Sequence, residues 1–370
     1  MSEPINVGLV GFGMSAQVFH APFLDVHPNF KITKVVERHD QKSKGKYPYV
    51  EVVNDISDLL HDSGIDLIVI TTPNTTHLPL ARAALEAGKH VILEKPFTIS
   101  TSDADQLISL AEKHHRVLSV FQNRRWDGDF LTVQKILESG YLGRLVEFES
   151  HFDRFRNYQK PNAWREENLP GSGILYDLGP HLIDQALVLF GLPEAVMADI
   201  RYQRDGSQTD DQFELVLNYP NLKVTLKAGM LVRESLPRFI LQGTDGSFIK
   251  YGLDPQEAAL KQGTIPAGPD WGMEPAGSWG KLNTEIDELH FEGRIETKAG
   301  CYQKYYDDIY SAITENTEPI VTAQQARNII HIIELAFQSD DEKRTIKFEK
   351  QLTAFFTQWI KSISKRLLPR

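Results

Sequence analysis

The chain has 370 residues, of which 41% are hydrophobic and 24% charged. This length allows two domains with ample cores, and the ordinary composition excludes a fibrous or largely disordered protein. The formal net charge of -10 argues against nucleic acid as the main partner. The single cysteine, Cys301, excludes an intramolecular disulfide and fits a cytoplasmic protein. We expect neither a signal peptide nor a membrane span, which would need about 20 apolar residues.

Short apolar segments alternate with helical patterns over the first third of the chain. Because the segments are almost continuously apolar, we expect a parallel sheet that helices cover on both faces. This predicts an α/β protein whose N-terminal Rossmann dinucleotide-binding domain spans residues 1–123, with its ligand at the carboxyl ends of the strands. The expected strands are 5–10, 31–36, 66–71, 90–93 and 116–121, and the expected helices are roughly 15–27, 55–63, 77–87 and 100–115.

After about residue 123 the pattern changes to longer alternating segments. Alternation predicts an open, mostly antiparallel sheet with one solvated face, in a C-terminal α+β domain for substrate binding and oligomerisation at residues 124–349. The Gly- and Pro-rich stretch 263–280 is expected to be a long loop. The expected strands are 145–153, 194–203, 212–219, 222–230 and 238–243, and the expected helices are 129–140, 173–190, 302–316 and 322–338.

A GxGxxA pattern follows the first strand directly and opens a helix. Gly11 would permit the tight turn, Gly13 would let backbone N–H groups approach a pyrophosphate, and Ala16 would let the helix pack close to the strand. The helix N-terminus adds favourable positive potential. A plain turn is the alternative, but the surrounding strand and helix favour dinucleotide binding.

The end of the second strand carries two opposite charges, Glu37 and Arg38. An acidic residue at this position holds the ribose hydroxyls of NAD, whereas a nearby arginine accommodates the 2′-phosphate of NADP. Glu37 would repel a phosphate unless it turned away, and Lys42 and Lys44 follow closely. We favour NADP and keep NAD open. The alternative is that both residues are solvated loop charges.

Polar residues follow the strand that ends at residue 71. Thr72, Pro73 and Asn74 would line the passage where a dinucleotide crosses the sheet edge, and His77 lies near a helix start. A helix cap formed by Asn74 or Thr75 is the alternative and is compatible with cofactor contact.

The sequence Glu94–Lys95–Pro96 follows the strand at 90–93, so Lys95 emerges at the ligand edge of the sheet. Glu94 could orient a substrate or ribose hydroxyl. A lysine near a positively charged nicotinamide can have its pKa lowered and act as an acid or base at neutral pH. Pro96 restricts Lys95 to extended geometry. Taken alone, the pair is also typical of a surface ion pair.

The stretch GSGILYDLGPHLIDQ (171–185) places Asp177, His181 and Asp184 at spacings of four and three. Asp177 and His181 would project from one helix face, and a histidine oriented by a carboxylate is a standard general base. Because Pro180 is unfavourable inside a helix, the helix either begins near it or is distorted there. A capping aspartate with a structural histidine is the alternative. Asp177 and His181 could also suggest a metal site, but no further clustered ligands support one.

The pieces GLVGFGMSAQVFH, TTPNTTH, EAGKHVILEKPF and GSGILYDLGPHLIDQ occur in one order, and over residues 5–348 the chain resembles the Gfo/Idh/MocA oxidoreductase family. Within that family it is most similar to NADP-dependent scyllo-inositol 2-dehydrogenase-like members, in VFQNRRWDGDFLT, ESHFDRFR, AWRE and GSFIKYGLDPQE. The resemblance implies a sugar or polyol substrate in a cleft between the domains, and a homodimer or homotetramer built through the open sheet. Glu37 ahead of Arg38 departs from NADP-linked relatives, which often have small residues there.

The resemblance also implies roles for the residues named above. Lys95 would touch both nicotinamide and the reacting hydroxyl, His181 would exchange the proton, and Asp177 would hold the substrate or the histidine. The catalytic set is therefore Lys95, His181 and Asp177, with no metal. The expected cofactor contacts are Gly11, Phe12, Gly13, Met14, Ser15, Glu37, Arg38, Thr72, Pro73, Asn74, His77, Glu94, Lys95, Arg124, Trp164 and Arg165.

The resemblance implies that Trp164 and Arg165 close over the nicotinamide, with Arg124 and Arg125 nearby. Arg154 and Arg156 would face the substrate, which leaves room for an acidic sugar, or else they lie on the strand surface. The expected substrate contacts are Lys95, Arg154, Arg156, Asp177 and His181.

The segment 350–370 predicts a basic amphipathic C-terminal helix, with five basic and no acidic residues. Such a helix either docks on its own or a partner subunit, which we favour, or lies on a membrane surface. Its apolar face would hold Leu352, Phe355, Phe356, Trp359, Ile360, Ile363 and Leu367.

The sequence thus predicts an NAD(P)-dependent dehydrogenase or reductase that transfers hydride to or from a secondary alcohol of a sugar or cyclitol. Two alternatives stay open. One is a family member that uses tightly bound NAD(P) for elimination or hydrolysis without net redox change. The other is a non-catalytic dinucleotide-binding regulator, against which the presence of Lys95, Asp177 and His181 together argues.

Overall fold

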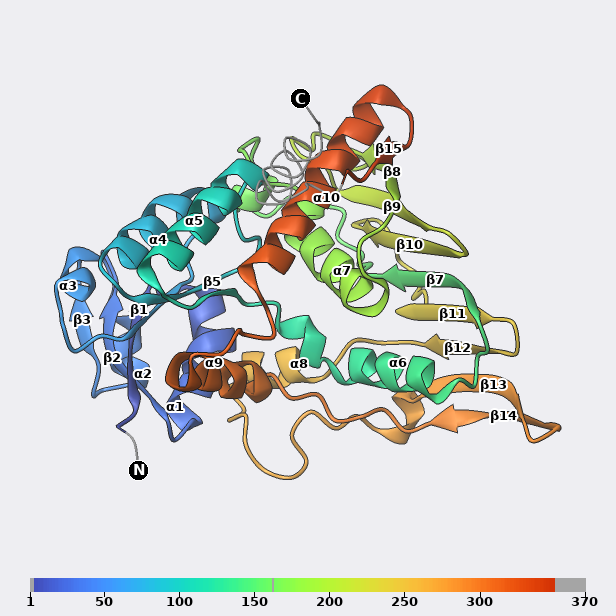
Figure 1. Cartoon of the computed structure of the whole chain (residues 1–370), viewed down its shortest axis with the longest axis horizontal. Helices are drawn as coiled ribbons and strands as arrows, with labels where there is room; N and C mark the ends of the chain where they lie inside the picture. The colour runs from blue at the N-terminus through green and yellow to red at the C-terminus, as the bar shows by residue number, and fades with distance from the viewer. Residues whose placement is uncertain (1–2, 162, 350–370) are drawn as a thin grey trace, which may run out of the picture.

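The computed structural model describes residues 3–161 and 163–349. Within these residues the strands form two sheets, which stand at opposite ends of the molecule in Figure 1 with helices between and around them. The first sheet has the order β3-β2-β1-β4-β5-β6, and the second has the order β14-β13-β12-β11-β7-β10-β9-β8-β15. The predicted fold class is confirmed: a Rossmann-type domain precedes a domain with an open, mostly antiparallel sheet.

All pairings in the first sheet are parallel. Its central strands are buried on both faces, because helices cover the sheet on both sides (Figure 1). The strand order reverses between β1 and β4, which places a ligand crevice at the carboxyl ends of these strands. The elements are β1 (Ile5–Val10), α1 (Ala21–Val26), β2 (Phe30–Val36), α2 (Lys42–Lys46), β3 (Glu51–Val53), α3 (Ser57–Leu60), β4 (Leu67–Ile70), α4 (His77–Glu86), β5 (His90–Leu93), α5 (Thr101–His114) and β6 (Leu118–Val120).

Three parts of this domain differ from the prediction, and one of them is the short helix α2 (Lys42–Lys46), which was not predicted. Strand β3 (Glu51–Val53) was not predicted, because three partly exposed residues at a sheet edge carry little periodicity. The helix expected at 15–27 begins instead with a π-helical turn, η1 (Ala16–His20), before α1 (Ala21–Val26). That turn places His20 in the protein interior, a position that bears on the site described below.

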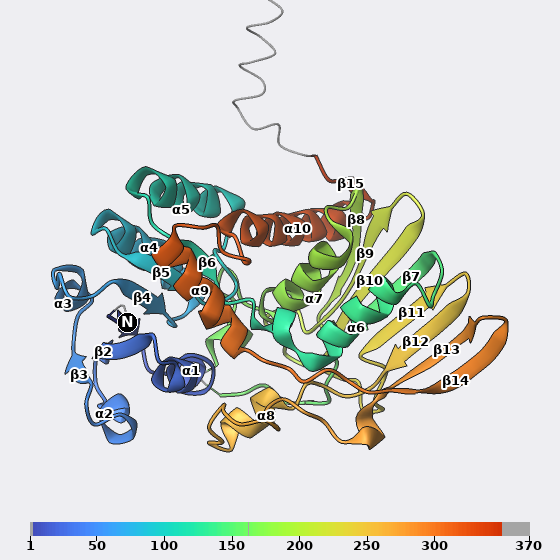
Figure 2. The same cartoon turned by 60° about the horizontal axis from the view of Figure 1, so that its bottom comes forward.

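The second sheet is antiparallel except where β7 and β10 pair in parallel. Helices α6, α7 and α10 lie on one face of this sheet, and the fan of strands leaves the other face open in Figure 2. The elements are α6 (Gly128–Ser139), β7 (Leu145–His151), α7 (Ile174–Phe190), β8 (Ala195–Arg201), β9 (Gln212–Tyr219), β10 (Leu222–Gly229), β11 (Phe239–Gly243), β12 (Gly246–Lys250), α8 (Gln256–Lys261), β13 (Gly280–Ile286), β14 (Leu289–Ile295), α9 (Gln303–Glu315), α10 (Ala323–Glu342) and β15 (Ile346–Lys347).

Strands β12, β13 and β14 and the short helix α8 were not predicted. They surround the expected loop at 263–280; β14 has no buried residue, and β13 buries only alternate positions of a largely polar sequence. An edge hairpin of this kind buries few apolar residues, so its sequence has a weak alternating pattern. Its place in the sheet comes from pairing with β12.

Helix α7 begins at Ile174 and runs through Pro180, so the alternative start near Pro180 is wrong. The first turn is held from outside: the Asp210 carboxylate accepts the Leu175 N–H at 2.7 Å. Gly173, at φ +90°, allows this contact, because a Cβ there would lie 1.8 Å from Asp210 Oδ1. A distant residue therefore sets the start of the helix.

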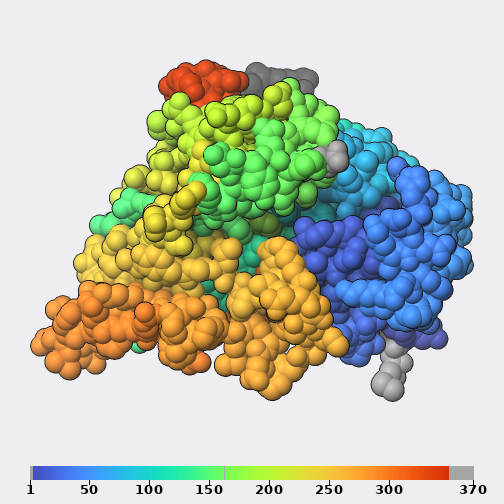
Figure 3. Space-filling view, turned by 180° about the vertical axis from the view of Figure 1, so that it is seen from behind, coloured from blue at the N-terminus to red at the C-terminus, as the bar shows by residue number. Residues whose placement is uncertain are grey.

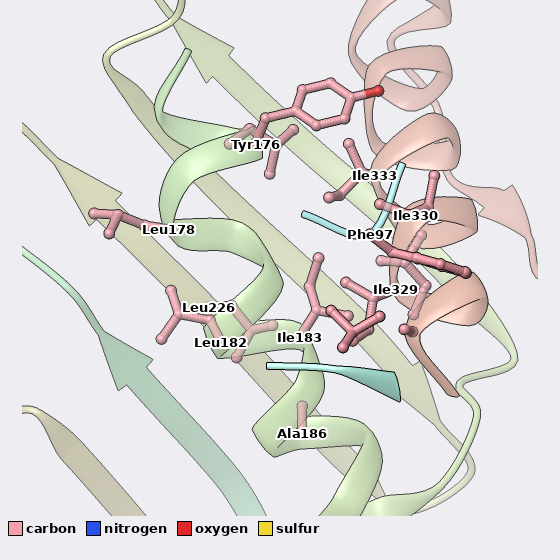
Figure 4. Packing of buried hydrophobic residues seen from close by; sticks show 14 of the residues in the cluster. Phe97, Tyr176, Leu178, Leu182, Ile183, Ala186, Leu226, Ile329, Ile330 and Ile333 are labelled. Atoms are coloured by element: carbon pink, nitrogen blue, oxygen red, sulfur yellow. The ribbon is translucent and has the colours of Figure 1, made fainter. Parts of the chain in front are cut away.

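Phe97 connects the turn after β5 to the core of the second domain. Its side chain is 1% exposed, and Figure 4 shows it among Ile329, Ile330 and Ile333 of α10. Ile183 of α7 lies in the same cluster (Figure 4). Burying a phenylalanine here fixes the turn that carries Lys95 against the two helices.

Across residues 3–161 and 163–349, no helix is long and apolar enough to cross a membrane. The amphipathic helix predicted at 350–370 lies outside the described residues.

We expect the substitution Phe97→Ala to destabilise the protein by about 3–5 kcal/mol, because it removes a fully buried ring and leaves a cavity. Urea unfolding followed by fluorescence measures this loss. Phe155→Ala is the matched control, since that ring is 44% exposed and its loss should change stability by less than about 1 kcal/mol. Equal losses in the two variants would contradict the packing role of Phe97.

Candidate functional site

A cleft of about 320 Å³ opens between the two domains. In Figure 3 the surface is hollowed where the blue N-terminal region meets the green and yellow regions. Its walls come from the carboxyl ends of β4 and β5, from the glycine turn after β1, from α7, and from the segment that follows β7. The cleft therefore occupies the crevice expected for a ligand of a doubly wound sheet.

Most of the predicted site residues line this cleft. The predicted residues that do not line it are Gly11, Phe12, Gly13, Glu37, Arg38, Pro73 and His77. The cleft-lining residues among those predicted are Met14, Ser15, Thr72, Asn74, Glu94, Lys95, Arg124, Arg154, Arg156, Trp164, Arg165, Asp177 and His181.

Lys95 reaches across the cleft to α7. Its Nζ donates to the Asp177 carbonyl oxygen at 2.7 Å and to Asp177 Oδ1 at 3.1 Å. Asp177 lies in the first turn of α7, three residues before Pro180. The Lys95–Pro96 peptide bond is cis. Lys95 is thus paired with α7 rather than with its neighbour Glu94, which excludes the simple surface ion pair.

Asp177 does not orient His181, since its carboxylate is bound to Lys95 and also to Arg165 Nε at 3.1 Å. Burial alone would raise the pKa of Asp177, but the charges of Lys95, Arg165 and Arg154 outweigh it and hold the pKa well below its usual range. Asp177 is therefore ionised at neutral pH. The predicted carboxylate–histidine pair is replaced by a carboxylate–lysine pair.

His181 lies one turn further along α7, on the cleft wall. Its ring stacks on Phe152 at 6.3 Å between centroids, and its buried Nδ1 has no hydrogen-bond partner among the described residues. Burial, followed by the charges of Lys95 and Arg124, lowers the pKa of His181 well below its usual value. The imidazole is therefore neutral at pH 7 and able to accept a proton.

Glu94 is held by a network that sequence reasoning missed. His20 Nε2 bonds to Glu94 Oε1 at 2.9 Å, and His20 Nδ1 bonds to the Tyr306 hydroxyl at 2.7 Å. Ser15 Oγ and the Lys95 backbone N–H also donate to the carboxylate. Burial would raise the pKa of Glu94, but these bonds and the Lys95 charge lower it to about 2. His20 ends the quoted motif GLVGFGMSAQVFH, yet nothing local indicates that the π-helical turn directs it inward.

His77 and Asn74 join the turns at the sheet edge. His77 does not line the cleft. Its Nδ1 bonds to the Pro96 carbonyl at 3.0 Å, and its Nε2 bonds to the Thr72 carbonyl at 3.0 Å. Asn74 Nδ2 donates to the Gly171 carbonyl at 2.7 Å, and the helix caps proposed for Asn74 and Thr75 are not formed. Asn74 Oδ1 is buried without a hydrogen-bond partner among the described residues.

Glu37 and Arg38 follow β2, and from the sequence they left the choice between NAD and NADP open. The structure gives the two side chains different surroundings. Glu37 is buried, and its carboxylate accepts the Lys42 N–H at 3.0 Å and the Ser43 N–H at 2.9 Å at the start of α2. Arg38 is exposed. The reading of Glu37 as a solvated loop charge is therefore wrong, because the helix N-terminus takes up its carboxylate.

The glycine turn fits a dinucleotide. Gly11 has φ +91°, and a Cβ there would lie 3.2 Å from Thr72 Cγ2 and 3.3 Å from Thr71 Oγ1. No atom lies within 4 Å of where a Cβ of Gly13 would be, so the backbone there is open to an approaching group. The helical segment starting at Met14 offers free N–H groups to a pyrophosphate. With the unpaired Asn74 Oδ1 on the same wall, these residues suit NAD(P).

Two adjacent arginines play different parts. Arg124 lines the cleft, pairs with Glu257 and lies over the Phe152 ring at 5.0 Å. Arg125 instead forms a bidentate pair with Asp184, at 2.8 and 2.6 Å, away from the cleft. Asp184 is therefore a structural residue, although its spacing from His181 had drawn attention to it.

The segment after β7 closes one side of the cleft and carries Trp164 and Arg165. Arg165 lies over the Trp164 ring at 4.5 Å. Glu166, which was not predicted, bonds to Arg156 and also to Arg204 Nη1 at 3.3 Å. A shared carboxylate therefore anchors this segment to the second sheet, a contact between residues too far apart in the chain to be visible as a motif.

The comparisons with known proteins cover nearly the whole chain. A family profile described as "Oxidoreductase family, NAD-binding Rossmann fold" matches residues 5–122, and "Oxidoreductase family, C-terminal alpha/beta domain" matches residues 134–348. The chain is 45% identical over 346 residues to the uncharacterized oxidoreductase YdgJ of Escherichia coli, covering 94% of this chain and 99% of YdgJ. It is 39% identical over 347 residues to the scyllo-inositol 2-dehydrogenase (NADP(+)) IolW of Bacillus subtilis, covering 94% and 97%. A solved oxidoreductase from Bacillus cereus matches with a TM-score of 0.86 at 36% identity, covering 94% of this chain and 99% of that one.

We expect the pKa of His181 to lie below 6.5 in the wild-type protein and to rise in Lys95→Met, because that substitution removes a nearby positive charge that disfavours the imidazolium form. Carbon–proton NMR titration of labelled histidines measures this, with the His181 signal assigned by its loss in His181→Gln. Lys135→Met, at an exposed site, is the control and should leave the titration unmoved. A His181 pKa unaffected by Lys95→Met would contradict the electrostatic coupling.

Proposed function

The chain belongs to the Gfo/Idh/MocA oxidoreductase family, as its sequence predicted, and we propose that it transfers hydride between NAD(P) and a secondary alcohol of a sugar or cyclitol. One observation carries the proposal: an ammonium group, Lys95, and a neutral imidazole, His181, lie on the walls of one cleft at the carboxyl edge of the dinucleotide-binding sheet. The IolW relative is named as an NADP-dependent inositol dehydrogenase, which supports this substrate class.

His181 takes the hydroxyl proton of the alcohol. Its lowered pKa keeps the ring neutral before the reaction, so it can act as the base in the direction of oxidation and as the acid after protonation. When bound, the nicotinamide ring supplies the hydride acceptor or donor. The carbon–hydrogen bond of the alcohol breaks as its carbon–oxygen bond becomes a carbonyl.

Lys95 polarises the reacting oxygen. An ammonium group has three donors, and Asp177 occupies two of them, through its carbonyl and its carboxylate. The third remains for the substrate oxygen, on which negative charge develops during oxidation. Asp177 acts through Lys95, because it fixes the ammonium group in position and compensates its charge.

NADP is the proposed cofactor. Glu37 has its carboxylate bound to the N-terminus of α2, so it is not free to repel a 2′-phosphate or to hold the ribose hydroxyls. Arg38 is exposed beside it and has no ion-pair partner within 4 Å among the described residues. The name of IolW, which specifies NADP(+), agrees with this choice.

We further propose that the protein is cytoplasmic and forms a homodimer or homotetramer through the open face of the second sheet. Helices cover one face of that sheet, and the other exposes apolar side chains such as Met197, which is 51% exposed. An open sheet face with apolar side chains is suited to a subunit interface.

We expect Lys95→Ala to lower kcat by about 10²–10⁴-fold, because the substrate oxygen loses the ammonium donor that would polarise it. Reduced-nicotinamide absorbance with a panel of polyols and sugars measures turnover, and cofactor fluorescence measures dinucleotide binding, which should remain. Lys135→Ala should retain full activity, since Lys135 is exposed on α6. Normal turnover in Lys95→Ala would refute the proposed role.

We expect Arg38→Ala to lower kcat/KM for NADP by about 10–100-fold and to affect NAD much less, because only NADP carries the phosphate that Arg38 would bind. Initial rates with both cofactors at one substrate concentration measure the change in preference. Arg82→Ala, at a partly exposed arginine on α4 that does not line the cleft, is the matched control. An equal loss with both cofactors would argue against a phosphate contact.

A further inference from the structure

The walls of the cleft carry more positive than negative side chains, although the whole chain has a formal net charge of -10. Eight lysines and arginines line the cleft, against six aspartates and glutamates. An oxidised nicotinamide would add a further positive charge. The cleft therefore has an excess of cations that the protein itself does not neutralise.

Arg154 is the partly buried cation of the cleft wall that has no ion-pair partner in the described part of the chain; Lys160, which also lines the cleft, is unpaired there too, but it is exposed. The described residues give the Arg154 guanidinium no hydrogen bond and no carboxylate within 4 Å, although the side chain is partly buried in the cleft. Burial lowers the pKa of Arg154, and the Asp177 charge only partly offsets this effect. A desolvated guanidinium is costly unless an anion pairs with it.

The two carboxylates that act most strongly on Arg154 are Asp177 and Glu257. Neither is free. Asp177 is already shared by Lys95 and Arg165, which leaves no surplus negative charge for a third cation. The nearby carboxylates are divided in the same way: Glu257 between Arg124 and Lys261, and Glu166 between Arg156 and Arg204.

Arg154 is also rigidly placed. Its N–H donates to the Gly229 carbonyl at 3.0 Å, and its carbonyl accepts the Val232 N–H at 3.1 Å. It follows Phe152 by two residues, so it continues the face of β7 on which Phe152 contacts His181. The buried Nε of Arg156, two residues further on, has no hydrogen-bond partner in the described part of the chain. Unused donors thus lie in the same cleft as the proton acceptor His181.

We propose that the substrate carries a carboxylate, as a uronate or an aldonate does, and that Arg154 binds this carboxylate while His181 faces the reacting hydroxyl. The inference rests on the proposed hydride transfer and narrows its substrate class. A carboxylate matches the planar fork of a guanidinium, and its single charge matches Arg154, the unpaired cation that the described cleft wall partly buries. A phosphate monoester carries about -1.5 to -2 charges at neutral pH, and the other unpaired cation among the described residues of the cleft, Lys160, is solvent-exposed.

Matched neutral and acidic sugars test the proposal with the wild-type enzyme and both cofactors. The pairs are D-glucuronate with D-glucose and D-gluconate with D-sorbitol, and D-glucose 6-phosphate tests the phosphate. We expect kcat/KM to be about 10–100-fold higher for the acid of each pair, the effect of one charged hydrogen-bonded contact. A preference for the neutral member, or for the phosphate over glucuronate, would overturn the assignment.

Variants at position 154 test the residue. Arg154→Met keeps the length of the side chain and should reduce the acid-to-neutral ratio of kcat/KM by about 10–100-fold, while Arg154→Lys should retain part of the ratio. Arg233→Met is the matched control: it removes the same charge from an exposed side chain that stacks on Phe155 at 4.0 Å and does not line the cleft. A ratio unchanged in Arg154→Met would overturn the role of Arg154.

Calorimetry of D-glucuronate binding to the cofactor-loaded protein gives a second readout that needs no turnover. Binding should be weaker in Arg154→Met than in Arg233→Met. Turnover of neutral polyols alone would contradict the proposed carboxylate on the substrate and would still agree with the proposed hydride transfer. No reduced nicotinamide from any polyol or sugar would overturn the proposed function instead, so the two failures are distinguishable.

Discussion

The bond between Lys95 and Asp177 is the interaction on which the candidate site depends. It joins the tip of β5 in the first domain to α7 in the second, through both the carbonyl and the carboxylate of Asp177. Both side chains are largely buried, and such charges are stable only when they are paired. The same ammonium charge disfavours protonation of His181. The Lys95–Asp177 contact therefore fixes the position of the Lys95 ammonium group, whose charge helps to keep the His181 imidazole neutral.

Around that contact the negative charges are shared. Asp177, Glu166 and Glu257 each hold two cations, and Glu94 is held by His20, Ser15 and the Lys95 backbone. Shared carboxylates keep long basic side chains in place before a ligand arrives, so little reorganisation is needed on binding. The same sharing explains why Arg154 is informative. Because Asp177, Glu166 and Glu257 already hold other cations, the positive charge of Arg154 is available to a ligand.

Much of the first domain could be predicted because its features are local. Four apolar residues in β4 or β5 are recognisable as a buried strand, and Gly11 marks a turn that only a small residue allows. Once the sheet is recognised, the strand that ends at Leu93 carries Lys95 to the ligand edge. The edge strands β3 and β14 were missed because strands without buried residues are defined by their neighbours in the sheet rather than by their own pattern.

By itself the sequence determined the family, the fold class and the chain positions that meet at the sheet edge, since these depend on periodicity and on short motifs. Tertiary structure alone decided which charges pair. Glu37 turned to the N-terminus of α2, Asp177 took Lys95 rather than His181, and His20 turned inward to Glu94. Each of these choices depends on burial and on partners distant in the chain or on a helix end nearby, because a charge removed from water must find whichever counter-charge or donor the fold brings within reach.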